Sequence, residues 1–449
     1  MGRSTGGAGA GAGAGATSKR SVAIQAQVEE VEMVEVEQEE GTDENSRLWS
    51  NLNEETLKHE PGSLMGSIAL VAGTTVGAGI LALPAVTKDA GYVPSSAVIV
   101  ACWLYSCVTG LLIAETNIRL MCELGRGGVS VLSMAKNTYG KTGGVLAGST
   151  YMFLHYALLV AYLARGGELL TEFIDTSPTA ASLAFAMLLG TTTYVSEPKV
   201  LDSINTSLVV AIVFSFTAIL AMALSNFDAS GLQLSDPSKA IFCVPVVALA
   251  FVFHNIIPVV ASNLEGDRKK IRNVILAGTS IPLVMFLLWN MAILGFHVDS
   301  DSGELDPLKL LQSDDKVGPY ITVFSLLAVA TSFIGFVLGL VDFIGDGLKL
   351  PINTKNVLPF ALTLFPPTVF AILKPDIFMS ALEYAGTYGV LGLFGVLPAG
   401  MAWRARKRDD LKHIPSMVPG GAPLLLLTGG SAMAIILQQT LINVGVMSK

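Results

Sequence analysis

The sequence predicts an all-α polytopic membrane protein with eleven transmembrane helices, and two observations carry this prediction. Aliphatic, aromatic, Met and Cys residues make up 51% of the 449 residues, whereas Asp, Glu, Lys and Arg make up only 14%. Apolar runs of about 20 residues recur from Gly66 onward, and a helix of that length crosses a hydrocarbon core about 30 Å thick. A soluble domain has more charge and shorter apolar segments.

Residues 1–62 differ from the rest and are predicted to form a disordered N-terminal extension, ahead of a transmembrane domain over residues 63–449. The extension opens with the low-complexity stretch GGAGAGAGAGATSKR, and no acidic residue occurs before Glu29. This composition is typical either of an organelle transit peptide or of a plain disordered tail. Nine acidic residues then crowd the segment from Glu29 to Glu44, which predicts a solvated acidic tail.

The apolar runs predict the positions and the orientation of the spans. Lys and Arg gather in alternate loops, 16 against 6 in the loops between them. Because the loops on the cytoplasmic or stromal side carry the excess of positive charge, we expect the N-terminus on that side and the C-terminus on the other. The spans are expected at approximately 66–87, 93–118, 143–172, 179–195, 203–225, 240–262, 272–297, 317–345, 354–373, 377–402 and 422–444.

Two of these spans contain residues that weaken a helix. Span 1 includes GTTVGAGILALP, in which Gly73 and Gly77 serve either close helix packing or an opened backbone. Span 6 includes AFVFHNIIP, where Pro258 follows the polar pair His254 and Asn255 and Pro245 precedes it; proline removes a backbone donor and opens the helix ladder. Two interrupted spans, five apart, predict two five-helix halves related by inverted topology.

Opened helices near the bilayer midplane expose backbone groups that bind ligands. Free N–H groups at the start of a half-helix attract an anion such as a carboxylate, and free carbonyls coordinate a cation. We therefore expect the two breaks to meet in one binding site. The expected substrate contacts at the breaks are Thr74, Thr75, Val76, Gly77, Ala78, Gly79, Phe253, His254 and Asn255.

Four motifs in order carry a family resemblance: GTTVGAGILALP, FHNIIP, GDRKKIRNVILAGTSIPLVMFLLWN and ATSFIGFVLGLVDFIGDGL. From Gly66 to the end of span 11 the chain resembles the hydroxy and aromatic amino acid permease family, which includes tryptophan and tyrosine permeases. The resemblance implies an eleven-helix amino acid symporter of the leucine-transporter (LeuT) type fold, usually proton-coupled. The N-terminal extension is absent from typical bacterial members. It is similar to those of plastid relatives in plants and algae, which implies the plastid inner envelope, with the N-terminus in the stroma.

Span 3 offers further polar side chains inside the membrane. Tyr151, His155, Tyr156 and Tyr162 are all able to face the site, and Tyr156, near the middle, is the predicted substrate contact; the alternative is a buried Tyr that bonds a carbonyl. At the break of span 6, His254 is either a proton carrier or a neutral side chain that caps a free carbonyl. Near the inner interface, Glu115, Asp342 and Asp346 are expected to be solvated or to act as gate residues.

A cation site is predicted where span 8 reads AVATS. The carbonyl of Ala328 and the hydroxyls of Thr331 and Ser332 would join the carbonyls of Gly73 and Val76, as similar patterns do in sodium-coupled members of the LeuT-type fold. The alternative is that both hydroxyls bond their own helix. The resemblance implies a coupling proton ahead of sodium, carried by His254 or an acid. Ser332 is also an expected substrate contact.

The expected function follows from the resemblance: a secondary active transporter that moves an amino acid by cation-coupled symport with alternating access. Aromatic residues at the breaks favour tyrosine or tryptophan. A serine or threonine symporter, a channel and a regulatory membrane subunit are the alternatives. No nucleophile with a base and no metal cluster occurs in the sequence, so an enzyme, a metal site and a cofactor are not expected. The expected partners are the amino acid and the lipid bilayer, not nucleic acid; the oligomeric state stays open.

Overall fold

The computed structural model describes residues 52–53, 58–59, 63–124, 129–225, 236–295, 317–348, 356–408 and 414–447, together with residues 227, 232, 312 and 350. The chain divides into two units, residues 1–61 and 62–449. In the first unit the described residues form β1 (Leu52–Asn53) and β2 (Lys58–His59), which pair antiparallel. The predicted transit peptide and acidic tail lie outside the described residues, and a plastid location stays a prediction.

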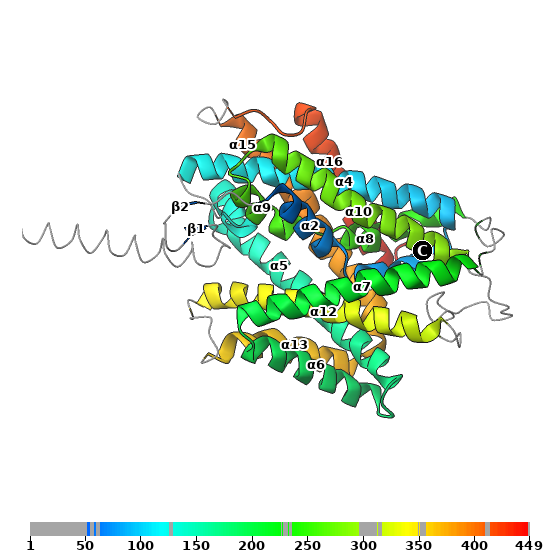
Figure 1. Cartoon of the computed structure of the whole chain (residues 1–449). Coiled ribbons are helices and arrows are strands. Elements are labelled where there is room, and N and C mark those ends of the chain that lie inside the picture. Colours follow the sequence, from blue (N-terminus) through cyan, green and yellow to red (C-terminus); the bar gives the residue numbers. More distant parts are fainter. Residues whose placement is uncertain are drawn as a thin grey trace, which may run out of the picture. The chain divides into compact units, whose positions relative to one another are not determined.

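The second unit is helical throughout its described residues, apart from turns and single residues (Figure 1). Each of the eleven predicted ranges overlaps one helix or one broken helix. In chain order these are α2 (Leu64–Thr75) with α3 (Gly79–Thr87), α4 (Tyr92–Leu124), α5 (Val131–Thr171), α6 (Pro178–Val195), α7 (Pro198–Ser225), α8 (Ala240–Ala250) with η3 (His254–Ile256) and α9 (Ile257–Asn263), α10 (Arg268–Leu294), α12 (Gly318–Leu348), α13 (Leu358–Leu373), α14 (Phe378–Tyr384) with η5 (Ala385–Val396) and α15 (Leu397–Lys407), and α16 (Gly421–Asn443). The short helices η2 (Pro237–Lys239) and η4 (Pro375–Ile377) precede α8 and α14.

Length and hydropathy qualify most of these helices as membrane spans. Among the described residues, eight helices are long and apolar enough to cross a bilayer, and a ninth is added if the bent pair of α2 and α3 counts as one span. The helix α13 is apolar but shorter, with 16 residues. The helix α6 ends in the polar run GTTTYV, which lowers its hydropathy. Eight or nine spans are therefore established by composition.

The break predicted in span 1 is confirmed. The helix α2 ends at Thr75, α3 begins at Gly79, and the two are bent by 52°. Val76 has extended backbone angles, with φ −79° and ψ 97°, and its N–H still donates to the carbonyl of Ala72. The last turn of α2 therefore keeps its geometry up to Val76, and the chain changes direction over the next two residues.

The break predicted in span 6 is also confirmed, but its position differs from the expected one. The helix α8 ends at Ala250, and residues 251–253 lie outside any helix. Pro258 stands in the first turn of α9, where a missing N–H costs nothing because that group has no partner within the helix. Pro258 thus starts α9 instead of opening the ladder, and the irregular stretch begins at Phe251, two residues before the opening that the sequence predicts near Phe253 to Ile257.

The helices around the two breaks pack closely against one another and enclose the space between the breaks. Helix α10 packs on α2 and α4, and α12 packs on both α5 and α7. Figure 1 shows α6 and α13 side by side at one edge of the bundle, with α12 and α7 next to them. Span 10 contains the π-helical segment η5, whose Gly386 lies so close to the Pro245 carbonyl that no side chain would fit. The broken span 6 is thereby supported by backbone contact.

A buried ion-pair network joins the C-terminal part of α4 to the end of α15. The Glu115 side chain is 1% exposed, and its two oxygens lie 2.7 and 2.8 Å from Nε and Nη2 of Arg406. Arg119 lies 3.5 Å away, and the backbone N–H of Met417 donates to Oε2. The expectation that Glu115 is solvated is wrong, because a partner 291 residues away in the chain covers it.

We expect Glu115→Gln to lower the free energy of unfolding by about 3 kcal/mol, because it leaves buried Arg119 and the largely covered Arg406 without their carboxylate. Glu123→Gln is the matched control. That side chain pairs with Arg408 at 2.8 Å but is 27% exposed, so its loss costs less than about 1 kcal/mol. Unfolding of both purified variants in the same detergent measures the difference; equal losses would show that the Glu115 network carries no special stability.

Candidate functional site

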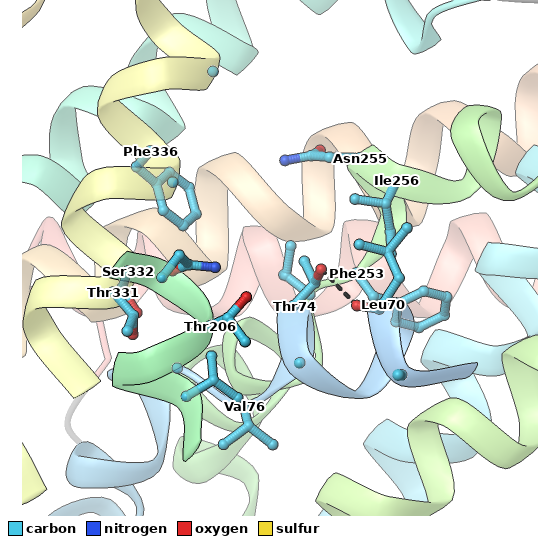
Figure 2. A pocket seen from close by; sticks show the side chains of 18 of the residues that line it. Leu70, Thr74, Val76, Thr206, Phe253, Asn255, Ile256, Thr331, Ser332 and Phe336 are labelled. Carbon is cyan, nitrogen blue, oxygen red and sulfur yellow. Dashed lines mark hydrogen bonds between the residues drawn. The ribbon is translucent and has the colours of Figure 1, made fainter. Parts of the chain in front are cut away.

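A cavity of about 500 Å³ lies where the two helix breaks meet. Its walls come from α2, the break after α8, α5, α7 and α12, as Figure 2 shows. The volume is within the range of small-molecule sites, about 300 to 1,000 Å³. Eight residues predicted for substrate or cation line it: Gly73, Thr74, Val76, Gly77, Phe253, Asn255, Thr331 and Ser332.

One hydrogen bond ties α12 to the break of span 1. The backbone N–H of Ala78 donates to Oγ of Ser332 at 2.9 Å, across 254 residues of sequence. A Cβ atom on Gly77 would stand 2.7 Å from the same Oγ. Glycine is therefore needed here for close approach rather than for an unusual φ. Ser332 does not bond its own helix, in contrast to Thr331, whose hydroxyl donates to the Ala328 carbonyl at 3.1 Å.

Fewer backbone N–H groups are free at the break of span 1 than the sequence predicts. The N–H of Val76 donates to Ala72 and that of Ala78 donates to Ser332, while Gly79 packs against Ala250. Within the described residues, the Gly77 N–H is left without a backbone acceptor, and the carbonyls of Gly73 and Val76 accept no hydrogen bond. The end of α2 therefore presents a partial negative charge to the cavity.

Aromatic rings from α5 and α12 form one wall. The ring centroids of Tyr151 and His155 are 3.9 Å apart, and those of His155 and Phe336 are 4.9 Å apart. Nδ1 of His155 lies 2.9 Å from the carbonyl oxygen of Tyr151. Because a carbonyl only accepts, Nδ1 carries the proton, and Nε2 keeps a lone pair. The wall thus offers flat apolar faces together with one basic nitrogen.

Asn205 and Thr206 of α7 also line the cavity, and Figure 2 shows Thr206 among the labelled residues of α2 and α12. Neither residue was predicted as a site residue from the sequence. They stand early in an otherwise apolar span, within the run SINTS, and that polar run was the available signal. An amide and a hydroxyl add hydrogen-bonding capacity opposite the break.

Several predicted residues lie outside the cavity lining. The hydroxyl of Tyr156 donates to the carbonyl of Leu362 on α13 at 2.8 Å, so this ring belongs to a helix contact. His254 is buried between Phe253 and Phe394, with centroids at 4.7 and 4.8 Å, and its Nε2 is 2.8 Å from Oγ1 of Thr109. The other residues absent from the lining are Thr75, Ala78, Gly79 and Ala328; the Thr75 hydroxyl donates to the Val71 carbonyl.

Residues 60–439 match the model of the tryptophan/tyrosine permease family. The chain belongs to this family. It is 32% identical over 406 residues to tyrosine-specific transport system 2 of Haemophilus influenzae, covering 85% of this chain and 97% of the relative. Tyrosine-specific transport system 1 of the same organism is 30% identical over 384 residues, covering 81% and 93%.

A third relative, a tryptophan-specific transport protein of Haemophilus influenzae, is 26% identical over 386 residues, covering 78% of this chain and 90% of the relative. The family and these relatives are permeases and not enzymes. This protein is accordingly an integral membrane protein of an amino acid permease family. The matched residues exclude nearly all of the N-terminal extension, and these three relatives are bacterial.

The contact between Gly77 and Ser332 generates a double-mutant prediction. Ser332→Ala should cost about 1 kcal/mol, since the Ala78 N–H loses its acceptor, and Gly77→Ala should cost about 1 to 3 kcal/mol through the clash with Oγ. The added Cβ is 4.0 Å from Cβ of residue 332. The double variant should therefore be no less stable than Ser332→Ala alone, which means a coupling of at least about 1 kcal/mol.

The control is Gly73→Ala, because a Cβ there meets no atom within 4 Å; its effect on unfolding should stay within about 0.5 kcal/mol. Thermal or chemical unfolding of the five purified proteins (wild type, the three single variants and the double variant) in detergent gives all the values. Strict additivity of the two substitutions would contradict the close contact.

Proposed function

We propose that this permease is a secondary active transporter of an aromatic amino acid, tyrosine or tryptophan, that works by cation-coupled symport with alternating access. The observation that carries the proposal is the cavity itself, which unites freed backbone groups of a helix break with a wall of aromatic rings. The tyrosine- and tryptophan-specific relatives support the same substrate class. A serine or threonine symporter is the second candidate, because α7 contributes polar side chains to the cavity.

The substrate binds with its polar end at the breaks and its ring against the aromatic wall. The carboxylate accepts hydrogen bonds from the Gly77 N–H and the Asn255 amide, and the ammonium faces the carbonyls at the end of α2. The side chain stacks on Phe336 next to His155. Asn255 and Phe336 are among the residues that Figure 2 labels around the cavity, and this arrangement replaces Tyr156 by His155 on the neighbouring face of α5.

The eleven helices form the eleven spans of a LeuT-type 5+5 inverted repeat, with α2/α3 and α8/α9 as the two interrupted spans. With the N-terminus inside, the lining residues of α2 and α12 lie between the breaks and the inner ends of those helices. On the outer side of the breaks, Ile80, Phe251 and Phe324 are fully buried. The cavity therefore opens inward and is closed outward, which favours alternating access over a channel.

We expect the purified protein in liposomes to take up labelled tyrosine or tryptophan with saturation and counterflow. Phe336→Ala should raise the KM for the aromatic substrate about tenfold. Loss of one aromatic contact costs roughly 0.5 to 1.5 kcal/mol of binding free energy, and the upper end of that range corresponds to a factor of about ten. The matched control is Phe365→Ala on α13, a ring 71% exposed on the outer surface of the helices, which should leave KM unchanged.

A panel of amino acids in the same assay separates the alternatives. Uptake of serine or threonine in preference to aromatic substrates would replace the aromatic assignment. Uptake without saturation or counterflow would indicate a channel, and the absence of any uptake would favour a regulatory subunit.

The coupling ion is a proton, carried by a histidine or an acid, and the oxygens around Thr331 and Ser332 form a separate cation site. His155 faces the cavity with a free lone pair on Nε2, whereas His254 is stacked and buried beside it. Sodium is the alternative coupling ion. Its oxygen ligands would be the carbonyls of Gly73 and Val76 and the Ser332 hydroxyl. The family resemblance to proton-coupled permeases favours the proton.

An imposed inward pH gradient without sodium should drive accumulation, and His155→Gln should abolish this response while tyrosine binding is retained. Thr331→Val combined with Ser332→Ala tests the oxygen site. If transport instead requires sodium, ignores the pH gradient and is lost in this double variant, the proton assignment is wrong and the sodium site stands. If the double variant changes neither coupling nor affinity, the oxygen site is wrong.

A further inference from the structure

A second cavity, of about 280 Å³, lies between the inner end of α4, the first turns of α5 and the end of α15. It is separate from the transport cavity and shares no lining residue with it. Four cationic side chains line it, Arg119, Arg404, Lys407 and Arg408, against one carboxylate, that of Glu123. We call these residues the basic cavity.

The ion pairs within the protein do not neutralise all the cationic side chains of the basic cavity. Glu123 forms a bidentate pair with Arg408, at 2.8 and 3.0 Å, and Glu115 is shared between Arg406 and Arg119. Within the described part of the chain, no carboxylate lies in ion-pair range of Arg404 or Lys407. The basic cavity and the neighbouring pair Arg406 and Glu115 are counted together here. Their described residues include five cationic side chains and two carboxylates.

The uncompensated cations are held on aromatic rings. The Arg404 guanidinium lies over the Tyr139 ring, 4.5 Å from its centroid, and donates to the Thr138 carbonyl at 2.9 Å. Nζ of Lys407 lies 4.6 Å from the Trp403 ring centroid. Such contacts fix the direction of a cation while leaving N–H groups unused. Asn137 and the two threonines of the lining add neutral polar groups.

The position of the basic cavity indicates where its ligand comes from. It stands at the ends of membrane helices, on the face where Lys and Arg are in excess, and Tyr and Trp are the residues that mark the headgroup level of a bilayer. Basic pockets between helices on that side suit anionic headgroups, with about 1 kcal/mol gained per Lys or Arg near the surface. We propose that the basic cavity binds the phosphate of an anionic phospholipid, and that this lipid joins α4, α5 and α15.

The lipid neutralises cations that otherwise repel one another at the junction of three helices. Its binding stabilises the folded protein, because a ligand that binds the native state alone raises the temperature of unfolding. This role does not depend on which amino acid the permease carries or on its coupling ion.

The test uses the full-length protein, purified in neutral detergent and freed of lipid. Phosphatidylglycerol in mixed micelles should raise its unfolding temperature in a saturable manner, and phosphatidylcholine at the same concentration should not. Arg404→Gln with Lys407→Gln should weaken the apparent affinity for phosphatidylglycerol about tenfold or more. Lys269→Gln with Arg272→Gln is the matched control: both side chains are exposed near the start of α10, outside the basic cavity, and this pair should stay within about twofold of the wild type.

Glu123→Gln gives a result that misfolding cannot imitate, since removal of the one carboxylate among the described lining residues should tighten phosphatidylglycerol binding. Equal stabilisation by phosphatidylcholine, or equal affinity of the two double variants, overturns the proposal. If inorganic phosphate alone gives the full rise in unfolding temperature, the ligand is a soluble anion and the assignment to lipid is wrong.

Discussion

Inside a bilayer a backbone N–H or C=O without a partner costs several kcal/mol, and this constraint governs where the helices of this permease can open. Two spans break near the middle of their length. At the first break, the Ser332 hydroxyl supplies the acceptor that the Ala78 N–H has lost. At the second, the chain returns to helix through the short turn of η3, and Pro258 stands where no donor is required. At the first break, Gly73 and Val76, whose carbonyls remain unbonded, line the cavity, so the cost of this break and the position of the site have the same origin.

Much of this arrangement was predictable because glycine and proline act locally. The glycines of GTTVGAGILALP and the prolines around FHNIIP identified both breaks, and the apolar runs gave the helices. The orientation of side chains around an apolar helix was harder. Tyr151 and His155 are four residues apart and share one face of α5, whereas Tyr156 stands about 100° further round and reaches α13. Residues 332, 336 and 339, which are four and three residues apart, likewise share one face of α12.

Contacts between distant segments were not predictable in the same way. Glu115 carries no local signal of its partner, since Arg406 and Met417 reach it from the far end of the chain. The contribution of α7 to the cavity follows from its packing against α12, and the polar run SINTS is the local signal that accompanies it. Hydropathy also assigns the weakly apolar α6 and the short α13 less clearly than their neighbours, although the two pack against each other and against α5. Composition thus describes each helix alone, whereas the site depends on pairs of helices.

The hydrogen bond from Ala78 to Ser332 has a consequence for the balance between conformational states. It links the hinge of one broken helix to a helix of the surrounding wall, and it exists only while those two elements keep their present spacing. A net contribution of about 1 kcal/mol to one state changes the equilibrium ratio of two states about fivefold. A hydrogen bond of ordinary strength at this hinge therefore favours the present conformational state. A ligand that competes for the Ser332 hydroxyl lowers the population of that state without any further contact.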